Sequence, residues 1–174
     1  QAGQPSRGIA AQVIHDALHL FHAVKTGHGN VDGVFGPSTA AQVAAFKKIF
    51  ELTGIQPKIM RLPGGSSNTV SKKYSKGVVT KIVERLNAEG YYYFDWNVDS
   101  TDATKDNVPA QTLLAKVKSS CKDKPVVNIL MHDTDQKKTT VEALPAIIDW
   151  LRAEGYQFMT LSPTSTPIRH TVNN

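Results

Sequence analysis

The sequence predicts an α/β protein with parallel strands, and three observations support this fold class. Short runs of aromatic and β-branched residues alternate with helix-length amphipathic segments between residues 58 and 161. Connections that can hold a helix favour parallel strands joined by right-handed crossovers. Residues 126–131 are apolar apart from Asn128, as expected for a strand covered on both faces. A helix–loop–helix segment is expected to precede this part of the chain.

The first fifty residues predict two helices. Apolar residues recur at helical spacing in residues 8–25, and again in residues 37–52 after a glycine-rich turn. Pro37 suits the first turn of the second helix, and Gly54 suits its end. We therefore expect a helical segment at residues 1–50 and a β/α domain at residues 51–174.

The β/α domain is expected to repeat strand and helix in a regular order. Strands are predicted at residues 58–62, 91–94, 126–131 and 156–161, and helices at residues 78–88, 108–119 and 139–154. Gly90 and Gly155 follow two of these helices, and Thr139 or Thr140 suits the start of the last one. Residues 95–102, which are rich in carboxylates, are predicted to form a loop after the second strand.

The composition and charge of the chain limit the kinds of partner that it is expected to bind. The chain has 174 residues and a net charge of +5, and no apolar run approaches the roughly 18 residues of a membrane span. Lysine and arginine are spread along helical stretches without a nucleic-acid motif, so we expect neither a membrane span nor nucleic-acid binding. A mildly basic surface would suit an anionic cell-wall polymer. Cys121 is the only cysteine, which excludes a disulfide within the chain.

Three chemically useful side chains stand at the ends of successive predicted strands. They are Arg61, Asp95 and His132. Because the carboxyl ends of parallel strands lie at one edge of a sheet, we expect these side chains to meet there. Asp95 could hold Arg61 in a bidentate pair, and His132 could act as a general acid or base. Each also has an ordinary alternative: a surface ion pair for Arg61, a loop cap for Asp95, and a hydrogen-bonded edge histidine for His132.

Three motifs in the same region resemble a known family. They are Arg-Leu-Pro-Gly-Gly at residues 61–65, Asp-Trp-Asn-Val-Asp-Ser at residues 95–100 and Leu-Met-His-Asp at residues 130–133. In order and spacing they resemble the third, fourth and fifth motifs of the polysaccharide deacetylases of carbohydrate esterase family 4, the NodB homology domain. The likeness is nearest to bacterial peptidoglycan deacetylases.

The resemblance implies a distorted or partial (β/α) barrel that removes N-acetyl groups from peptidoglycan-like or chitin-like polymers with a divalent metal, expected to be zinc. It implies that His132 protonates the leaving amine, that Arg61 tethers the catalytic base, and that Asp95 orients this arginine. The positions that it implies for substrate binding are Trp96, Leu130, Pro63 and Gly64.

The first two motifs of that family have no clear counterpart. The strand ending in Thr-Phe-Asp-Asp-Gly, which gives the base and a metal ligand, is absent, and the His-Ser/Thr-x-x-His motif has no clean copy. His15 and His19 stand four residues apart, a spacing that can bind a metal from one helix face, so they are the first candidate ligands. His22 and His28 are further candidates. Histidines on an amphipathic helix are more often simply solvated.

Residues 30–39 resemble a second family. Their sequence, Asn-Val-Asp-Gly-Val-Phe-Gly-Pro-Ser-Thr, resembles the signature of a small helical peptidoglycan-binding domain. The alternative is a plain helix–loop–helix whose turn residues happen to match.

Three functional hypotheses follow from the sequence. The first is a metal-dependent N-deacetylase, a hydrolase of carbon–nitrogen amide bonds. The second is a non-catalytic protein that binds cell-wall glycan, and the third is a recombined or incomplete sequence without activity. The first two imply an extracellular or cell-wall location, a glycan partner and a monomeric chain.

Overall fold

The computed structural model describes residues 8–9, 51–55, 58–62, 64–73 and 75–173. These residues fall into two compact units. One contains residues 8–9 and 96–168, and the other contains the described residues from 51 to 95 together with residues 169–173. Each unit combines helices with a pair or pairs of parallel strands, which confirms the predicted α/β class.

Most of the predicted helical segment, with His15 and His19, lies outside the described residues, as does Pro63. The boundary at residue 50 therefore stays a prediction. Gly8 and Ile9 are described, and here the prediction of a helix is wrong: they form strand β1, Gly8–Ile9. Residues 51–53 are helical, and Gly54 follows at a φ of +67°, a conformation that glycine adopts readily.

Two parallel strand pairs lie in the unit that contains residues 96–168. Strand β1 pairs with β6, Gln157–Phe158, and β4, Val98–Asp99, pairs with β5, Ile129–Leu130. The prediction of a plain loop at residues 95–102 is thus wrong, because β4 lies within it. The side chain of Asn97 reinforces this pairing: its amide donates to the Val126 carbonyl at 2.9 Å and accepts from the Asn128 N–H at 2.8 Å.

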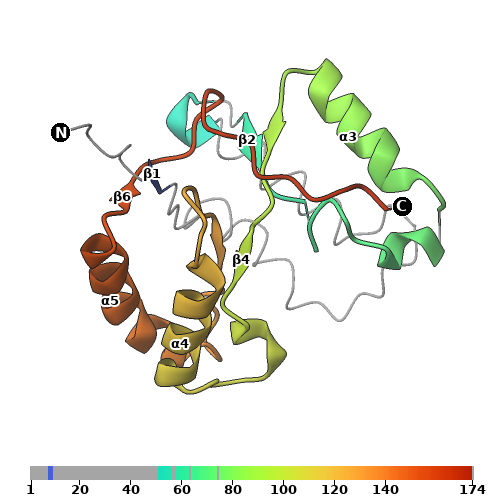
Figure 1. Cartoon of the computed structure of the whole chain (residues 1–174). Helices are drawn as coiled ribbons and strands as arrows, with labels where there is room; N and C mark the ends of the chain where they lie inside the picture. The colour runs from blue at the N-terminus through green and yellow to red at the C-terminus, as the bar shows by residue number, and fades with distance from the viewer. Residues whose placement is uncertain (1–7, 10–50, 56–57, 63, 74, 174) are drawn as a thin grey trace. The chain divides into compact units, whose positions relative to one another are not determined.

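Two helices pack side by side in the same unit, α4 at Ala110–Cys121 and α5 at Lys138–Ala153 (Figure 1). Leu113 and Val117 of α4 are fully buried, as their spacing predicts. Together with residues from α5 and the strands they form one apolar core, whose buried members are Val98, Val108, Leu113, Val117, Cys121, Val127, Ala143, Ile147, Leu151 and Tyr156.

Cys121 ends α4 inside this core, with 1% of its surface exposed. Burial raises the pKa of its thiol to about 11, and the charge of Lys124 opposes this rise only in part. The Tyr156 hydroxyl donates to the Cys121 carbonyl at 3.1 Å and to the Lys124 carbonyl at 2.7 Å. The end of α4 is therefore bound to the segment that precedes β6.

The other unit is built around strands β2, Ile59–Met60, and β3, Tyr92–Tyr93, which pair in parallel. Helix α3, Val78–Ala88, joins them after a short 3₁₀ turn, η1 at Val70–Lys73. The bounds of α3 are those predicted. The helix buries only part of its apolar side, because Val79 is buried whereas Ile82, three residues later, is 41% exposed. None of the helices in the described part of the chain is long and apolar enough to cross a membrane.

Candidate active site

The partly buried His132 and the buried Asp102 form a pair next to the end of β5. His132 follows β5 after one residue, and Asp102 begins η2, the 3₁₀ turn Asp102–Thr104 that follows β4. The imidazole Nδ1 lies 2.8 Å from Asp102 Oδ1, and the His132 backbone N–H donates to Asp102 Oδ2 at 2.6 Å. The pairing of β4 with β5 brings both segments together, since Ser100 N–H donates to the Leu130 carbonyl.

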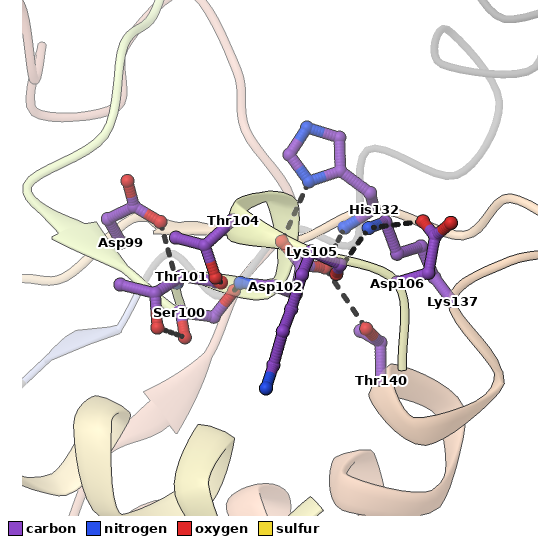
Figure 2. A network of polar contacts seen from close by, with 10 residues as sticks. All are labelled: Asp99, Ser100, Thr101, Asp102, Thr104, Lys105, Asp106, His132, Lys137 and Thr140. Carbon is purple, nitrogen blue, oxygen red and sulfur yellow. Dashed lines mark hydrogen bonds and ion pairs between the residues drawn. The ribbon is translucent and has the colours of Figure 1, made fainter. Parts of the chain in front are cut away.

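The Asp102 carboxylate accepts a further hydrogen bond from helix α5. The Thr140 hydroxyl donates to Oδ2 at 3.1 Å (Figure 2). The predicted start of this helix is Thr139 or Thr140, but α5 begins at Lys138, and Lys137 before it makes no side-chain cap. The Thr140 hydroxyl instead donates a hydrogen bond to the buried Asp102 carboxylate.

These contacts keep Asp102 ionised in spite of its burial. Burial alone would raise the pKa of Asp102, but the hydrogen bonds from the His132 ring and backbone, the charge of His132 and the hydrogen bond from Thr140 together lower it. An ionised carboxylate at Nδ1 fixes the ring orientation and favours a proton on Nδ1. The imidazole side chain remains 21% exposed, whereas Asp102 is 1% exposed. The pair can therefore transfer a proton through Nε2.

A set of local hydrogen bonds shapes the segment that carries Asp102. Thr101 has a positive φ of 64°, and its N–H donates to Asp99 Oδ1 at 2.7 Å. Lys137 crosses to this segment from the start of α5, and its Nζ donates to the Lys105 carbonyl at 2.9 Å and to Asp106 at 3.4 Å (Figure 2). The segment is thus held at both ends of η2.

Arg61 and Asp95 lie in the other unit. Arg61 follows β2, and Asp95 follows β3, as predicted. Burial lowers the pKa of Arg61, and the charge of Asp95 opposes that change, so the two charges attract each other. Because His132 belongs to the first unit, the predicted meeting of all three side chains stays a prediction.

Asp95 is also the centre of a buried hydrogen-bond network. Its Oδ1 accepts from the Ser66 N–H at 2.8 Å, and its Oδ2 accepts from the Ser66 hydroxyl at 2.5 Å and from the His170 N–H at 2.8 Å. Ser67 lies 3.0 Å from the His170 ring, hydroxyl to Nδ1. Arg169 donates to the Tyr93 carbonyl and stacks on the Tyr93 ring at 4.3 Å. Asp95 therefore ties the segment after Arg61 to the C-terminal tail.

The residues predicted to bind substrate differ in their burial and backbone conformation. Trp96 is half-buried, and Leu130 is half-buried within β5. Gly64 is exposed at a φ of +69°, and a Cβ on it would meet the Asn68 amide at 2.7 Å. The positive φ of Gly64 in the Arg-Leu-Pro-Gly-Gly motif thus favours glycine at this turn.

The described residues alone do not make a metal site. Among residues 8–9 and 51–173, within the gaps stated above, no three His, Cys, Asp or Glu side chains gather closely enough to hold a metal ion. His15 and His19 lie outside that part. The chemistry that the described side chains support is proton transfer at His132.

Asp102 and Thr140 are the site residues that sequence reasoning missed. In the sequence Asp102 is one of several carboxylates after the second predicted strand, and its role depends on the pairing of β4 with β5. A signal was nonetheless present, since a carboxylate that follows a strand can reach the end of the neighbouring strand.

Comparison with known proteins identifies relatives over much of the chain, although no family model matches. YheN of Bacillus subtilis, named as a polysaccharide deacetylase, is 31% identical over 122 residues, which are 68% of this chain and 39% of that protein. A peptidoglycan-N-acetylglucosamine deacetylase of Bacillus cereus is 32% identical over 113 residues, 63% of this chain and 38% of that protein. The chain thus spans less than half the length of these curated relatives.

Solved structures agree in fold. The catalytic domain of a peptidoglycan N-acetylglucosamine deacetylase from Eubacterium rectale matches with a TM-score of 0.70 and 26% identity, over 99% of this chain and 96% of that one. A polysaccharide deacetylase of Bacillus cereus matches with a TM-score of 0.58 and 25% identity, over 80% and 65%. A CE4 esterase of Streptococcus mutans matches with a TM-score of 0.56 and 25% identity, over 71% and 52%. Sequence and fold together confirm that the chain belongs with the polysaccharide deacetylases of carbohydrate esterase family 4.

Proposed function

We propose that the chain is an N-deacetylase that hydrolyses N-acetyl groups on an aminosugar polymer, with peptidoglycan as the substrate class. The names of its relatives support the substrate class and the reaction. The observation that carries the proposal within this chain is the His132–Asp102 pair, because amide hydrolysis needs a proton donor for the departing amine.

The pair suits this step. An amide nitrogen leaves as a neutral amine only if it receives a proton as the carbon–nitrogen bond breaks. The partly exposed His132 ring presents Nε2 for that proton, while Nδ1 is held by the ionised Asp102. The carboxylate stabilises the imidazolium that carries the proton, and the ring returns to the charged state by taking a proton from water.

Other assignments belong to the same proposal. Arg61 would tether the catalytic base and Asp95 would orient it, with support from the attraction between their charges. Trp96, Leu130, Pro63 and Gly64 would line the groove for the glycan. The strands would form a distorted or partial (β/α) barrel, for which the parallel pairs and the structural relatives give support.

The cofactor and the setting are proposed on the family resemblance. A divalent metal, zinc, is expected, with His15 and His19 as candidate ligands. The protein is expected to act as a monomer outside the cell or at the cell wall, where its polymer substrate lies. Zinc content can be measured by elemental analysis of the chain and of His15→Ala and His19→Ala variants.

Acetate release tests the function. The chain is incubated with zinc and a fully acetylated chitooligosaccharide, and released acetate and the mass of the sugar are followed. His132→Ala is expected to reduce the rate about 10²- to 10⁴-fold, the usual contribution of a general acid. Glu142→Gln, at an exposed position of α5, is the matched control and should keep the full rate. A folded chain that binds the sugar and releases no acetate would instead support the glycan-binding alternative.

A further inference from the structure

The first turn of α5 and the two residues before it are joined to the Asp102 segment at several points. Thr140 donates to Asp102 Oδ2 at 3.1 Å, Lys137 donates to the Lys105 carbonyl at 2.9 Å, and the Asn107 N–H donates to the Gln136 carbonyl at 3.4 Å. Figure 2 shows Thr140 and His132 on two sides of the same carboxylate. The residues at the start of this helix therefore form part of the hydrogen-bond environment of Asp102.

The hydroxyl of Thr140 can be removed with little change in side-chain shape. Thr140 is 6% exposed, and valine has the same β-branched shape, so Thr140→Val removes the hydrogen-bonding oxygen and keeps the branch. Threonine near a helix start commonly caps the helix with its hydroxyl, yet this hydroxyl reaches a carboxylate on another segment. Its specific contribution is thus the hydrogen bond to Oδ2.

We propose that Thr140 is a positioning residue for His132, acting through Asp102. The hydroxyl and the His132 N–H both occupy Oδ2, which leaves Oδ1 for the imidazole and fixes the rotation of the carboxylate. The hydroxyl also shares part of the negative charge of the carboxylate, which weakens the attraction between Asp102 and a protonated His132 ring. This inference rests on the proposed role of His132 as general acid.

Other charged groups near the pair set the background for any pH measurement. Asp99, Lys105 and Asp106 lie on the segment that carries Asp102. Asp133 follows His132, and Lys137 lies at the start of α5 with its ammonium group on Asp106. A test of Thr140 must therefore change the hydroxyl alone and leave all of these charges in place.

Thr140→Val makes this change, and carbon-13 NMR of the Asp102 carboxyl in the full chain measures it. The pKa of Asp102 is expected to rise, because one of the hydrogen bonds that lower it is lost. Thr140→Ser should restore the value of the original chain. Thr139→Val, one residue earlier and half-buried, is the matched control and should leave it unchanged. This readout needs no activity, so it separates a failure of the inference from a failure of the proposed function.

Kinetics give the second readout. With Thr140→Val, kcat should fall roughly tenfold or more, as for the loss of a hydrogen bond to a charged group, with KM little changed. The pH above which acetate release declines should move upward, and Thr140→Ser should reverse both effects. An Asp102 titration that is the same in Thr140→Val would overturn the proposal. A Thr140→Val chain that does not fold would also overturn it, because the hydroxyl would then be needed for the fold.

Discussion

Two buried aspartates, one in each unit, have the same kind of hydrogen-bond shell and different uses. Asp95 is 0% exposed and Asp102 is 1% exposed, and each accepts hydrogen bonds on both oxygens. Backbone N–H groups of distant segments are among the donors, two of them for Asp95 and one for Asp102. Asp95 accepts from Ser66 and from the backbone of His170. Asp102 accepts from the ring of His132, which can gain or lose a proton. The two aspartates therefore differ in the groups that donate hydrogen bonds to them, and not in how deeply they are buried.

This difference explains why sequence reasoning chose Asp95 as the chemical residue. Asp95 leads a recognisable motif and follows a clear strand, whereas Asp102 stands at the end of a polar stretch. In the structure Asp95 fastens the C-terminal tail to the segment after Arg61, in addition to its attraction for Arg61. Asp102 holds the group that can move a proton.

The largest expected difference between the two aspartates is in what each contributes to the free energy of unfolding. Asp95→Asn is expected to lower the free energy of unfolding by about 3 kcal/mol, because either orientation of the amide turns its NH₂ group toward a backbone N–H. Asp102→Asn is expected to cost only about 1 kcal/mol, because the His132 ring can change tautomer and accept from the amide. Urea unfolding of both variants measures this. Equal losses of unfolding free energy in the two variants would show that the two hydrogen-bond networks contribute equally to stability.

A smaller effect is expected in the dependence of stability on pH. The folded pKa of Asp102 is lower than the ordinary value of 3.8. In the window between these two values the unfolded chain binds more protons, so Asp102 contributes stability above about pH 4, and this contribution is lost as the pH falls through the folded pKa. The difference in stability between the original chain and Asp102→Asn should therefore shrink in acid. Thermal unfolding at a series of acid pH values would reveal a constant difference if the assignment is wrong.

The smallest effect is expected for His170→Ala. The substitution removes the contact of the ring with Ser67 but keeps the backbone N–H that binds Asp95, so the loss should be below about 1 kcal/mol. His132→Ala removes a side chain that binds its aspartate directly and is the paired comparison. A loss for His170→Ala as large as that for Asp95→Asn would mean that the ring, and not the backbone, anchors the tail.

Local signals explain what could be predicted from the sequence. Helix α3 begins and ends at the predicted residues, because apolar spacing and Gly90 are both encoded within the segment. The position of His132 just after a strand could be predicted for the same reason, since residues 126–131 before it are apolar apart from Asn128.

Features that depend on distant partners could not be predicted. Val98 and Asp99 stand among Asp, Asn and Ser, a composition typical of loops, and they become a strand only by pairing with Ile129 and Leu130. The roles of Asp102 and Thr140 follow from that pairing and from the packing of α5. Sequence spacing places Asp102 near the end of a strand, but it does not identify His132 and Thr140 as the partners of this carboxylate.

The buried thiol described above gives the molecule an internal probe of its own opening. Because Cys121 is the only cysteine and lies within the apolar core, a thiol reagent can reach it only when that core separates. Its raised pKa further suppresses the reactive thiolate at neutral pH. The rate of alkylation in native buffer would therefore report the free energy of transient exposure for the α4 region, without any added label.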